Sequence, residues 1–281
     1  MAVQIQTEKQ VQTKMQAKVT GAGAPLVLVP GGLTGWLSWE PHVERLAANR
    51  QVVSVQLLSV EYGLEKRKLP VGYSLETESQ ALAATLDELG LTAPLDLVAW
   101  SFGGAITLDY ALDHPDRVLT LTLIEPPALW VLGKQAPRGP KYESALALSK
   151  AIRDDVSEAQ LEQFALAVGL CPLGKRPSEL PQWPVWLRHR QSLLNTSAPF
   201  RHRDDPDRLR TFHGPVLLVK GTDSAGFLHQ IIDSLASQLP DAQVVEMPGG
   251  HAPQIASMDR FLEQLAVFQN AAHGQSVPKE R

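Results

Sequence analysis

Short apolar runs alternate with helical segments along most of this chain, and this alternation constrains the fold more than any other feature. Residues 26–29 are apolar throughout and end in Pro-Gly-Gly. Such a run fits a strand buried on both faces, as in a parallel sheet. We expect further strands at 51–57, 95–100, 118–124, 215–220 and 243–247, and helices at 41–48, 75–89, 101–112, 227–239 and 255–268. The alternation predicts an α/β fold with a mostly parallel, doubly wound sheet.

The alternation stops between residues 128 and 212. This segment is helical in pieces, is interrupted by prolines and contains Trp130, Trp183 and Trp186. Ligand sites of doubly wound folds lie at the carboxyl ends of the strands, so we expect an inserted helical lid there. The predicted organisation is a core domain (1–127 and 213–270), a lid (128–212) and a polar, frayed tail (271–281). Loose alternation over residues 3–19 predicts an antiparallel hairpin at the sheet edge.

Composition argues against several functional classes. The chain has 281 residues and a formal charge of −4, which gives no basic surface for nucleic acid. Its one cysteine, Cys171, cannot form an intrachain disulfide. The amino-terminal residues are polar and no apolar run approaches about 18 residues, so we expect a cytoplasmic protein without membrane contact. No metal-ligand spacing or phosphate loop is evident, so no metal or cofactor is expected. The oligomeric state stays open, with a homodimer among the options.

The segment from Leu95 to Gly104 carries the strongest functional signal. A buried strand runs directly into a helix with Ser101 at the junction, flanked two positions away by Ala99 and Gly103. A sharp strand–turn–helix crowds these small neighbours and strains the serine backbone, which exposes the hydroxyl. The free N–H groups at a helix start favour negative charge developing there. This is the pattern of a nucleophile elbow, with Ala99 in place of the usual first glycine.

An oxyanion hole needs two N–H donors near the nucleophile. The first expected donor is Phe102, the residue after the nucleophile. The second is expected in the loop after an early strand, where Gly31 and Gly32 let the backbone approach a substrate. We assign Gly32 to this role, with Leu33 as the neighbouring alternative.

The nucleophile also needs a general base and an acid that orients it. His251 is the predicted base, because it follows the last predicted strand and precedes the last helix. Asp223 is one candidate acid, but it lies one residue before the usual position, which Ser224 occupies. Glu125 is the other, at the carboxyl end of the strand after the elbow helix, and its longer side chain reaches further. We favour Glu125 and keep Asp223 as the alternative.

With these residues in place, the chain resembles the α/β-hydrolase superfamily over nearly its whole length. The matching segments are residues 29–32, the elbow at Ser101, residues 114–118 and residues 248–251. The resemblance implies the α/β-hydrolase fold and a cofactor-independent Ser-His-acid triad. Local features are also similar to fungal zearalenone-type lactonases. That similarity implies an oxyanion loop at residues 29–33, Glu125 as triad acid, and substrate contact by the Pro-Val-Trp tryptophan, Trp186.

Large apolar side chains near the nucleophile and in the predicted lid suggest an apolar substrate. We expect Leu33, Trp100, Trp183 and Trp186 to contact it. The predicted reaction is hydrolysis of a carboxylic ester or lactone of a small apolar or aromatic compound through an acyl-enzyme. Carbon–carbon bond hydrolysis and perhydrolysis use the same triad and stay open. A hydrolase-like ligand receptor with slow turnover is a further alternative.

Overall fold

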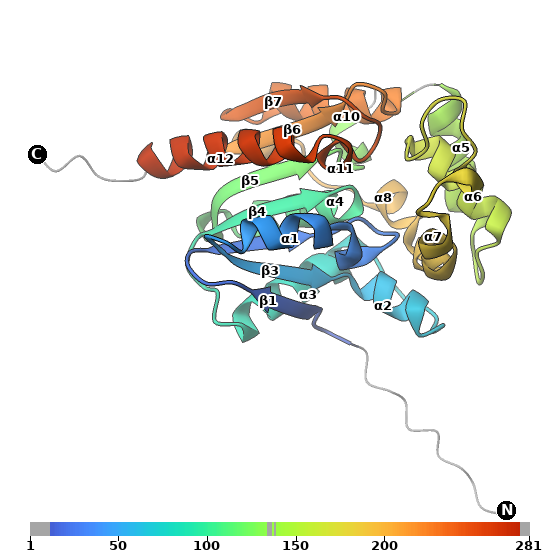
Figure 1. Cartoon of the computed structure of the whole chain (residues 1–281), viewed down its shortest axis with the longest axis horizontal. Helices are drawn as coiled ribbons and strands as arrows, with labels where there is room; N and C mark the ends of the chain where they lie inside the picture. The colour runs from blue at the N-terminus through green and yellow to red at the C-terminus, as the bar shows by residue number, and fades with distance from the viewer. Residues whose placement is uncertain (1–11, 134–136, 138, 276–281) are drawn as a thin grey trace, which may run out of the picture.

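A seven-stranded sheet forms the centre of the computed structural model, which describes residues 12–133, 137 and 139–275 (Figure 1). The strands are β1 (Gln16–Thr20), β2 (Pro25–Val29), β3 (Gln51–Gln56), β4 (Leu95–Trp100), β5 (Val118–Ile124), β6 (Val216–Gly221) and β7 (Ala242–Met247). They lie in the order β1-β3-β2-β4-β5-β6-β7. β1 pairs antiparallel with β3, and the other pairs are parallel. The predicted mostly parallel, doubly wound sheet is confirmed.

Helices cover both faces of the sheet (Figure 1). One face carries α1 (Glu40–Leu46) and α12 (Met258–Gln275), and the other carries α3 (Leu75–Glu88), α4 (Phe102–Asp113) and α10 (Gly226–Gln238). Shorter helices are η1 (Gly35–Ser38), α2 (Leu58–Leu64), η2 (Pro115–Arg117) and α11 (Pro253–Ala256). In the described part of the chain, no helix is both long and apolar enough to cross a membrane.

The apolar strands supply two cores because successive side chains of a strand point to opposite faces. On β2, Leu26 and Leu28 pack in one cluster with Phe261 of α12. The alternating residues Val27 and Val29 pack in the other cluster, which includes α3 and α4. All four of these side chains have 0% exposure, which explains why residues 26–29 form a continuous apolar run instead of an alternating one.

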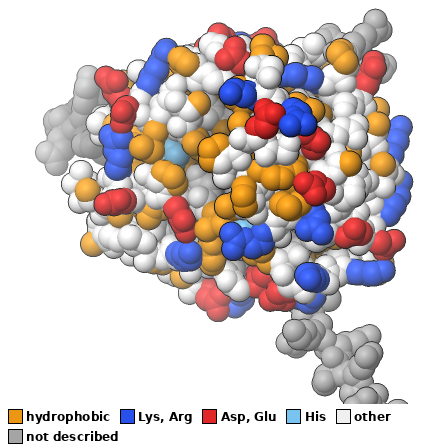
Figure 2. Space-filling model, turned by 45° about the vertical axis from the view of Figure 1, so that its right-hand side comes forward, with side chains coloured by type: hydrophobic (Ala, Val, Ile, Leu, Met, Phe, Trp, Pro, Cys, Tyr) orange, Lys and Arg blue, Asp and Glu red, His pale blue; other side chains and the backbone are white. Residues whose placement is uncertain are grey.

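The segment of residues 128–212 lies between β5 and β6 in the chain and beside the carboxyl ends of the parallel strands (Figure 1). It contains η3 (Leu129–Leu132), α5 (Pro140–Ala151), α6 (Glu158–Val168), η4 (Pro177–Glu179), α7 (Trp183–His189), η5 (Arg190–Asn195), α8 (Ala198–Arg201) and α9 (Asp207–Arg210). Prolines stand in the first turn of α5, η4, α7 and α8. Proline fits there but not in a helix interior, which accounts for the short helices. Figure 2 turns this side toward the viewer and shows hydrophobic side chains near its centre with charged side chains around them.

The structure differs from the expected elements at three places. Residues 58–64 form α2, which was not predicted, and the single helix expected at 255–268 is two helices, α11 and α12. The expected hairpin over residues 3–19 stays a prediction, because residues 3–11 lie outside the described residues; within the described residues, β1 is an edge strand that pairs antiparallel with β3. The expected frayed tail begins as helix, because α12 continues to Gln275; residues 276–281 lie outside the described residues.

Candidate active site

Ser101 stands at the sharp turn between β4 and α4. Its backbone has φ 53° and ψ −125°, a conformation that residues other than glycine rarely adopt. A Cβ at Gly103 would lie 2.2 Å from the Pro30 carbonyl oxygen, so only glycine fits there. The Ser101 N–H donates to the Ile124 carbonyl at 2.8 Å and holds the turn against β5. The predicted strand–serine–helix junction is present, and Ser101 lines a cavity.

His251 is held through its ring and its backbone. Its Nε2 lies 2.8 Å from Ser101 Oγ, and its Nδ1 lies 2.7 Å from Glu125 Oε2. Its backbone N–H donates to the Gly169 carbonyl at 2.9 Å. Its carbonyl accepts from the indole N–H of Trp100 at 2.7 Å. Every polar group of the residue therefore has a partner, which fixes the imidazole between the serine and the acid.

Glu125 is the acid that the structure brings to His251. The residue is fully buried, with φ 45°, at the end of β5. Its Oε1 accepts from the Gly221 N–H at 2.8 Å, and its Oε2 accepts from the Ser224 hydroxyl at 2.5 Å as well as from the imidazole. Three donors around one carboxylate are the environment of a negatively charged acceptor.

Asp223, the alternative acid, takes no part in this arrangement. The residue is exposed, and its backbone N–H donates to the Gly249 carbonyl at 2.8 Å. Among the described residues it makes no hydrogen bond or ion pair with His251. Ser224 occupies the usual acid position and donates its hydroxyl to Glu125. The sequence showed that a serine stood there, but not that it supports the acid on the neighbouring strand.

The predicted oxyanion donors flank the nucleophile. Gly32 and Phe102 both line the cavity together with Ser101. Phe102 is the first residue of α4, where a backbone N–H has no acceptor within the helix. A Cβ at Gly32 would lie 3.2 Å from the Cβ of Phe102, so the two backbones approach closely. Leu33, the neighbouring alternative, is not part of the cavity wall.

The cavity has a volume of about 70 Å³ and a mostly apolar wall. Its apolar lining comes from the sheet loops, α10 and the 128–212 segment: Phe102, Pro127, Leu129, Ala145, Leu148, Phe164, Val168, Leu193, Pro199, Phe200, Phe227 and Leu228. Ser101, His251, Asn195 and Thr196 supply its polar side chains. No Asp, Glu, Lys or Arg belongs to the wall as far as the described residues go.

Leu33, Trp183 and Trp186, which were predicted to contact substrate, are not in the wall of this cavity. Leu33 and Trp183 pack in the apolar core of the 128–212 segment, and Trp186 packs against that core. Short, interrupted helices bury their large side chains among themselves, because each helix needs an apolar partner for its buried face. Phe164 and Phe200 line the cavity instead. Spacing alone did not distinguish wall residues from core residues.

Trp100, also predicted to contact substrate, supports the site from behind. Its side chain packs in the cluster that includes α12 and is not part of the cavity wall. A Cβ at Gly31 would lie 2.9 Å from the Trp100 ring, so the indole lies directly under the oxyanion loop. The Trp100 and His251 ring centroids are 5.7 Å apart. One buried side chain therefore supports both the loop that contains Gly31 and Gly32 and the backbone of His251.

A buried polar network lies on the other side of the oxyanion loop. Asn195 of η5 donates to the Ser59 hydroxyl at 3.0 Å, and its Nδ2 would lie 2.8 Å from a Cβ at Gly32. The Ser59 N–H donates to Glu78 at 2.8 Å, and the Tyr73 hydroxyl donates to the same oxygen at 2.6 Å. Burial raises the pKa of the Glu78 carboxyl despite these donors. The network ties η5 to α2 and α3 next to the predicted oxyanion hole.

No metal or cofactor was expected from the sequence. In the described residues, Asp109, His202 and Asp204 come together with their ligand atoms within 4.8 Å of one another. Sequence spacing did not reveal this group, because Asp109 lies on α4 and the other two follow α8.

Comparison with known proteins places these features in a family. The chain matches the model of the alpha/beta hydrolase family over residues 26–264. It is 38% identical over 107 residues to the 2-hydroxy-6-oxo-2,4-heptadienoate hydrolase of Pseudomonas putida, a match to 37% of this chain and 38% of that protein. The chain thus spans little more than a third of that relative. A second relative comes from Azorhizobium caulinodans and is provisionally named carbamate hydrolase RutD. It is 27% identical over 257 residues, which are 89% of this chain and 93% of that protein.

Solved structures share the fold along most of the chain. An esterase from Thermogutta terrifontis has a TM-score of 0.71 at 20% identity, covering 92% of this chain and 94% of its own. The esterase RhEst1 from Rhodococcus sp. has a TM-score of 0.71 at 23% identity, covering 91% and 94%. At these identities the likeness is one of fold. The resemblance to zearalenone-type lactonases stays a prediction, whereas the family match over most of the chain confirms the wider expectation: this protein belongs to the alpha/beta hydrolase family.

Proposed function

We propose that this protein is a serine hydrolase that cleaves a neutral carboxylic ester or lactone with a small apolar acyl part. The observation that carries the proposal is the continuous line from Ser101 through His251 to Glu125, which opens onto an apolar cavity. A serine hydroxyl beside an oriented imidazole is the arrangement that acyl transfer requires.

In the proposed mechanism, Ser101 Oγ attacks the ester carbonyl carbon while His251 Nε2 takes the hydroxyl proton. The imidazolium keeps its Nδ1–H bonded to Glu125, which stabilises the new positive charge. The N–H groups of Gly32 and Phe102 receive the oxyanion. Collapse of the tetrahedral intermediate breaks the carbon–oxygen bond, and His251 donates its proton to the leaving alkoxide. Water, deprotonated by the same base, then hydrolyses the acyl-enzyme.

The cavity wall favours a neutral substrate over an anionic one. Burying a carboxylate without a cationic partner is costly, and the described wall contains no Lys or Arg. The Pseudomonas putida relative is named for a dienoate, which carries a carboxylate. A volume of about 70 Å³ favours short acyl groups. These features argue for a small ester rather than a carbon–carbon substrate of the dienoate type.

The 128–212 segment is proposed to act as the lid of this site. It contributes Leu148, Phe164, Leu193 and Phe200 to the cavity wall. The carbonyl of Gly169, just after α6, accepts from the backbone of His251. A lid in this position would exclude water from the acylation step and set the size of the acyl group.

The proposal is tested by labelling and turnover on one preparation. A fluorophosphonate should label Ser101 stoichiometrically, and Ser101→Ala should abolish both labelling and turnover. We expect p-nitrophenyl acetate and butyrate to be cleaved at least about tenfold faster, by kcat/KM, than the laurate ester. Small lactones extend the ester series. A 2-hydroxy-6-oxo-dienoate tests carbon–carbon bond hydrolysis, and hydrogen peroxide with acetate tests perhydrolysis.

Three results would overturn the proposal. Labelling of Ser101 without turnover of any ester would indicate a ligand receptor. Faster cleavage of the dienoate than of every ester would indicate carbon–carbon hydrolysis. Failure of the serine to react with the fluorophosphonate, in a folded protein, would remove the nucleophile itself.

A further inference from the structure

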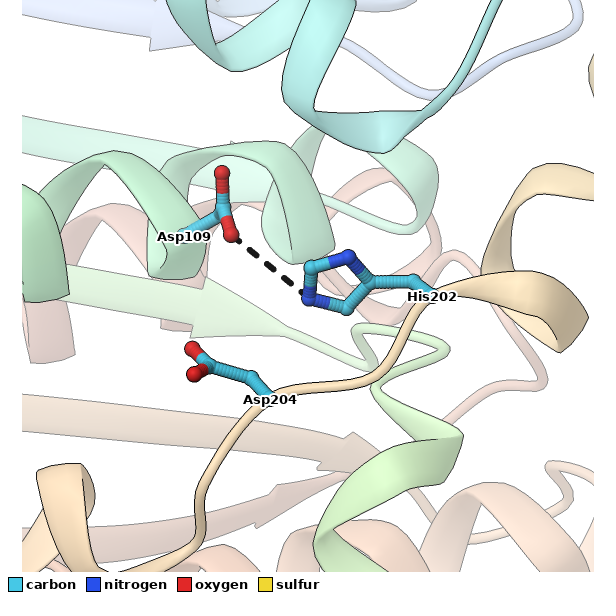
Figure 3. A group of neighbouring side chains, drawn as sticks. All are labelled: Asp109, His202 and Asp204. Atoms are coloured by element: carbon cyan, nitrogen blue, oxygen red, sulfur yellow. Dashed lines mark ion pairs between the residues drawn. The ribbon is translucent and has the colours of Figure 1, made fainter. Parts of the chain in front are cut away.

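A histidine and two aspartates form a compact group outside the Ser101 site (Figure 3). Asp109 projects from α4, His202 follows α8, and Asp204 lies two residues further along the same connection. His202 Nε2 and Asp109 Oδ1 are 3.5 Å apart, and the ligand atoms of all three residues lie within 4.8 Å of one another. The side chains of His202 and Asp109 are only 3% and 7% exposed.

Glu76 orients the imidazole of His202 from the opposite side. Its Oε1 lies 2.8 Å from His202 Nδ1. When a carboxylate accepts the Nδ1–H, the Nε2 lone pair points away from it, here toward Asp109 and Asp204. Metal-binding histidines commonly show this arrangement, with a carboxylate on the ring nitrogen that does not bind the metal.

The charges around His202 do not balance within the group. Three carboxylates surround the ring, and in the described ion pairs both Glu76 and Asp109 contact only His202. Arg208 neutralises part of the charge on Asp204, at 2.7 Å, but it also pairs with Asp113. Ser79 donates a further hydrogen bond to Asp109. A buried carboxylate without a full counter-charge favours a bound cation.

We propose that Asp109, His202 and Asp204 bind one divalent first-row metal ion, for which Zn²⁺ is the probe of choice. One imidazole nitrogen and two carboxylate oxygens suit such an ion. With zinc bonds of about 2.0–2.2 Å, donors in tetrahedral geometry lie roughly 3.4 Å apart, so the most widely separated ligand atoms, within 4.8 Å now, have to approach by up to about 1.4 Å. Water completes the coordination.

The proposed ion would hold the fold together and would not act on the ester. Asp109 lies on α4 roughly 12 Å along the helix axis from Ser101, at 1.5 Å per residue. The ion would link this core helix to the connection that follows Phe200, which lines the cavity. It would therefore stabilise one wall of the cavity from behind.

The test uses the full chain, stripped with EDTA and desalted, and titrated calorimetrically with ZnCl₂. We expect one ion per chain and a rise in melting temperature with added Zn²⁺. Asp204→Asn should weaken binding at least about tenfold, whereas Asp205→Asn, at an exposed neighbouring acid, should leave it unchanged. Glu76→Gln should weaken binding about 10–100-fold, because it removes the charge that orients the ring.

Absence of stoichiometric binding would overturn the proposal. So would equal Zn²⁺ affinity in Asp204→Asn and Asp205→Asn, because binding would then occur elsewhere. If Asp204→Asn does not fold, Asp109→Asn provides the same comparison. Because the readouts are binding and melting temperature, the result is independent of whether the protein cleaves esters.

Discussion

Replacing Glu125 with glutamine removes one negative charge and preserves the size of the side chain. The native carboxylate accepts from the Gly221 N–H, the Ser224 hydroxyl and His251 Nδ1. An amide has one acceptor oxygen, so its NH₂ group must face at least one of these donors. Leaving a buried donor unpaired costs about 1–3 kcal/mol, so we expect a lower melting temperature as well as a slower reaction.

The effect on rate follows from the charge that His251 acquires. With the Nδ1–Oε2 distance of 2.7 Å, the centres of the imidazolium and carboxylate charges lie roughly 4 Å apart. Their attraction is about 4 kcal/mol at an effective dielectric constant of about 20. The charge develops only in the transition state, so losing this attraction should lower kcat about 10³-fold.

The assay is steady-state hydrolysis of p-nitrophenyl butyrate, with the melting temperature of each variant measured alongside. Asp223→Asn is the matched control, because it removes a carboxylate from the other candidate acid. We expect kcat of that variant to stay within about twofold of the unmodified protein. A folded Glu125→Gln variant within about tenfold of normal kcat, or an equal loss in Asp223→Asn, would refute the assignment of the acid.

Three further predictions follow from the same contacts. Trp100→Phe removes the hydrogen bond to the His251 carbonyl, which contributes about 0.5–1.5 kcal/mol. We therefore expect kcat to fall about 2–10-fold with KM unchanged, and a change confined to KM would contradict this. Gly103→Ala places a Cβ 2.2 Å from the Pro30 carbonyl, so activity should fall at least about 10²-fold, and near-normal turnover would contradict the close approach. Burial lowers the pKa of His42 below its usual 6.5, so the unfolded chain binds the proton more readily. The free energy of unfolding should therefore fall as the pH drops below 6.5, by up to about 1.4 kcal/mol per unit. Urea unfolding at pH 7.5 and 5.5 measures how strongly the free energy of unfolding depends on pH. We expect this dependence to be weaker in His42→Gln than in the unmodified protein, and an equal dependence in both would contradict the prediction.

The sheet was predictable because its signals are local. The predicted strands at 95–100 and 118–124 coincide with β4 and β5, whose apolar runs are buried on both faces. α2 was missed because residues 58–63 are all buried, so the segment shows no amphipathic period. The break between α11 and α12 falls at Ser257, where no proline or glycine marks it.

The cavity was much less predictable than the positions of Ser101 and His251. Ser101 and His251 are specified by turns of a few residues, which the sequence displays directly. The fate of Trp183 depends on how α7 packs against its neighbours, and that packing places it in the core of the segment. Trp100 shows a similar limit: the side-chain alternation along β4 directs its indole away from the cavity, although it is adjacent to the nucleophile in sequence.

The contacts of His251 also constrain how a substrate enters. The Gly169 carbonyl, immediately after α6, bonds to the backbone of the base. If the whole 128–212 segment swung away, this bond would break and the imidazole would lose part of its support. We therefore expect entry through local movement of residues 193–200, which supply Leu193 and Phe200 to the wall, while residues 165–170 stay docked. Amide exchange should then be faster in 193–200 than in 165–170, and it should slow on labelling of Ser101. Faster exchange in 165–170 would instead indicate that the base is released whenever the site opens.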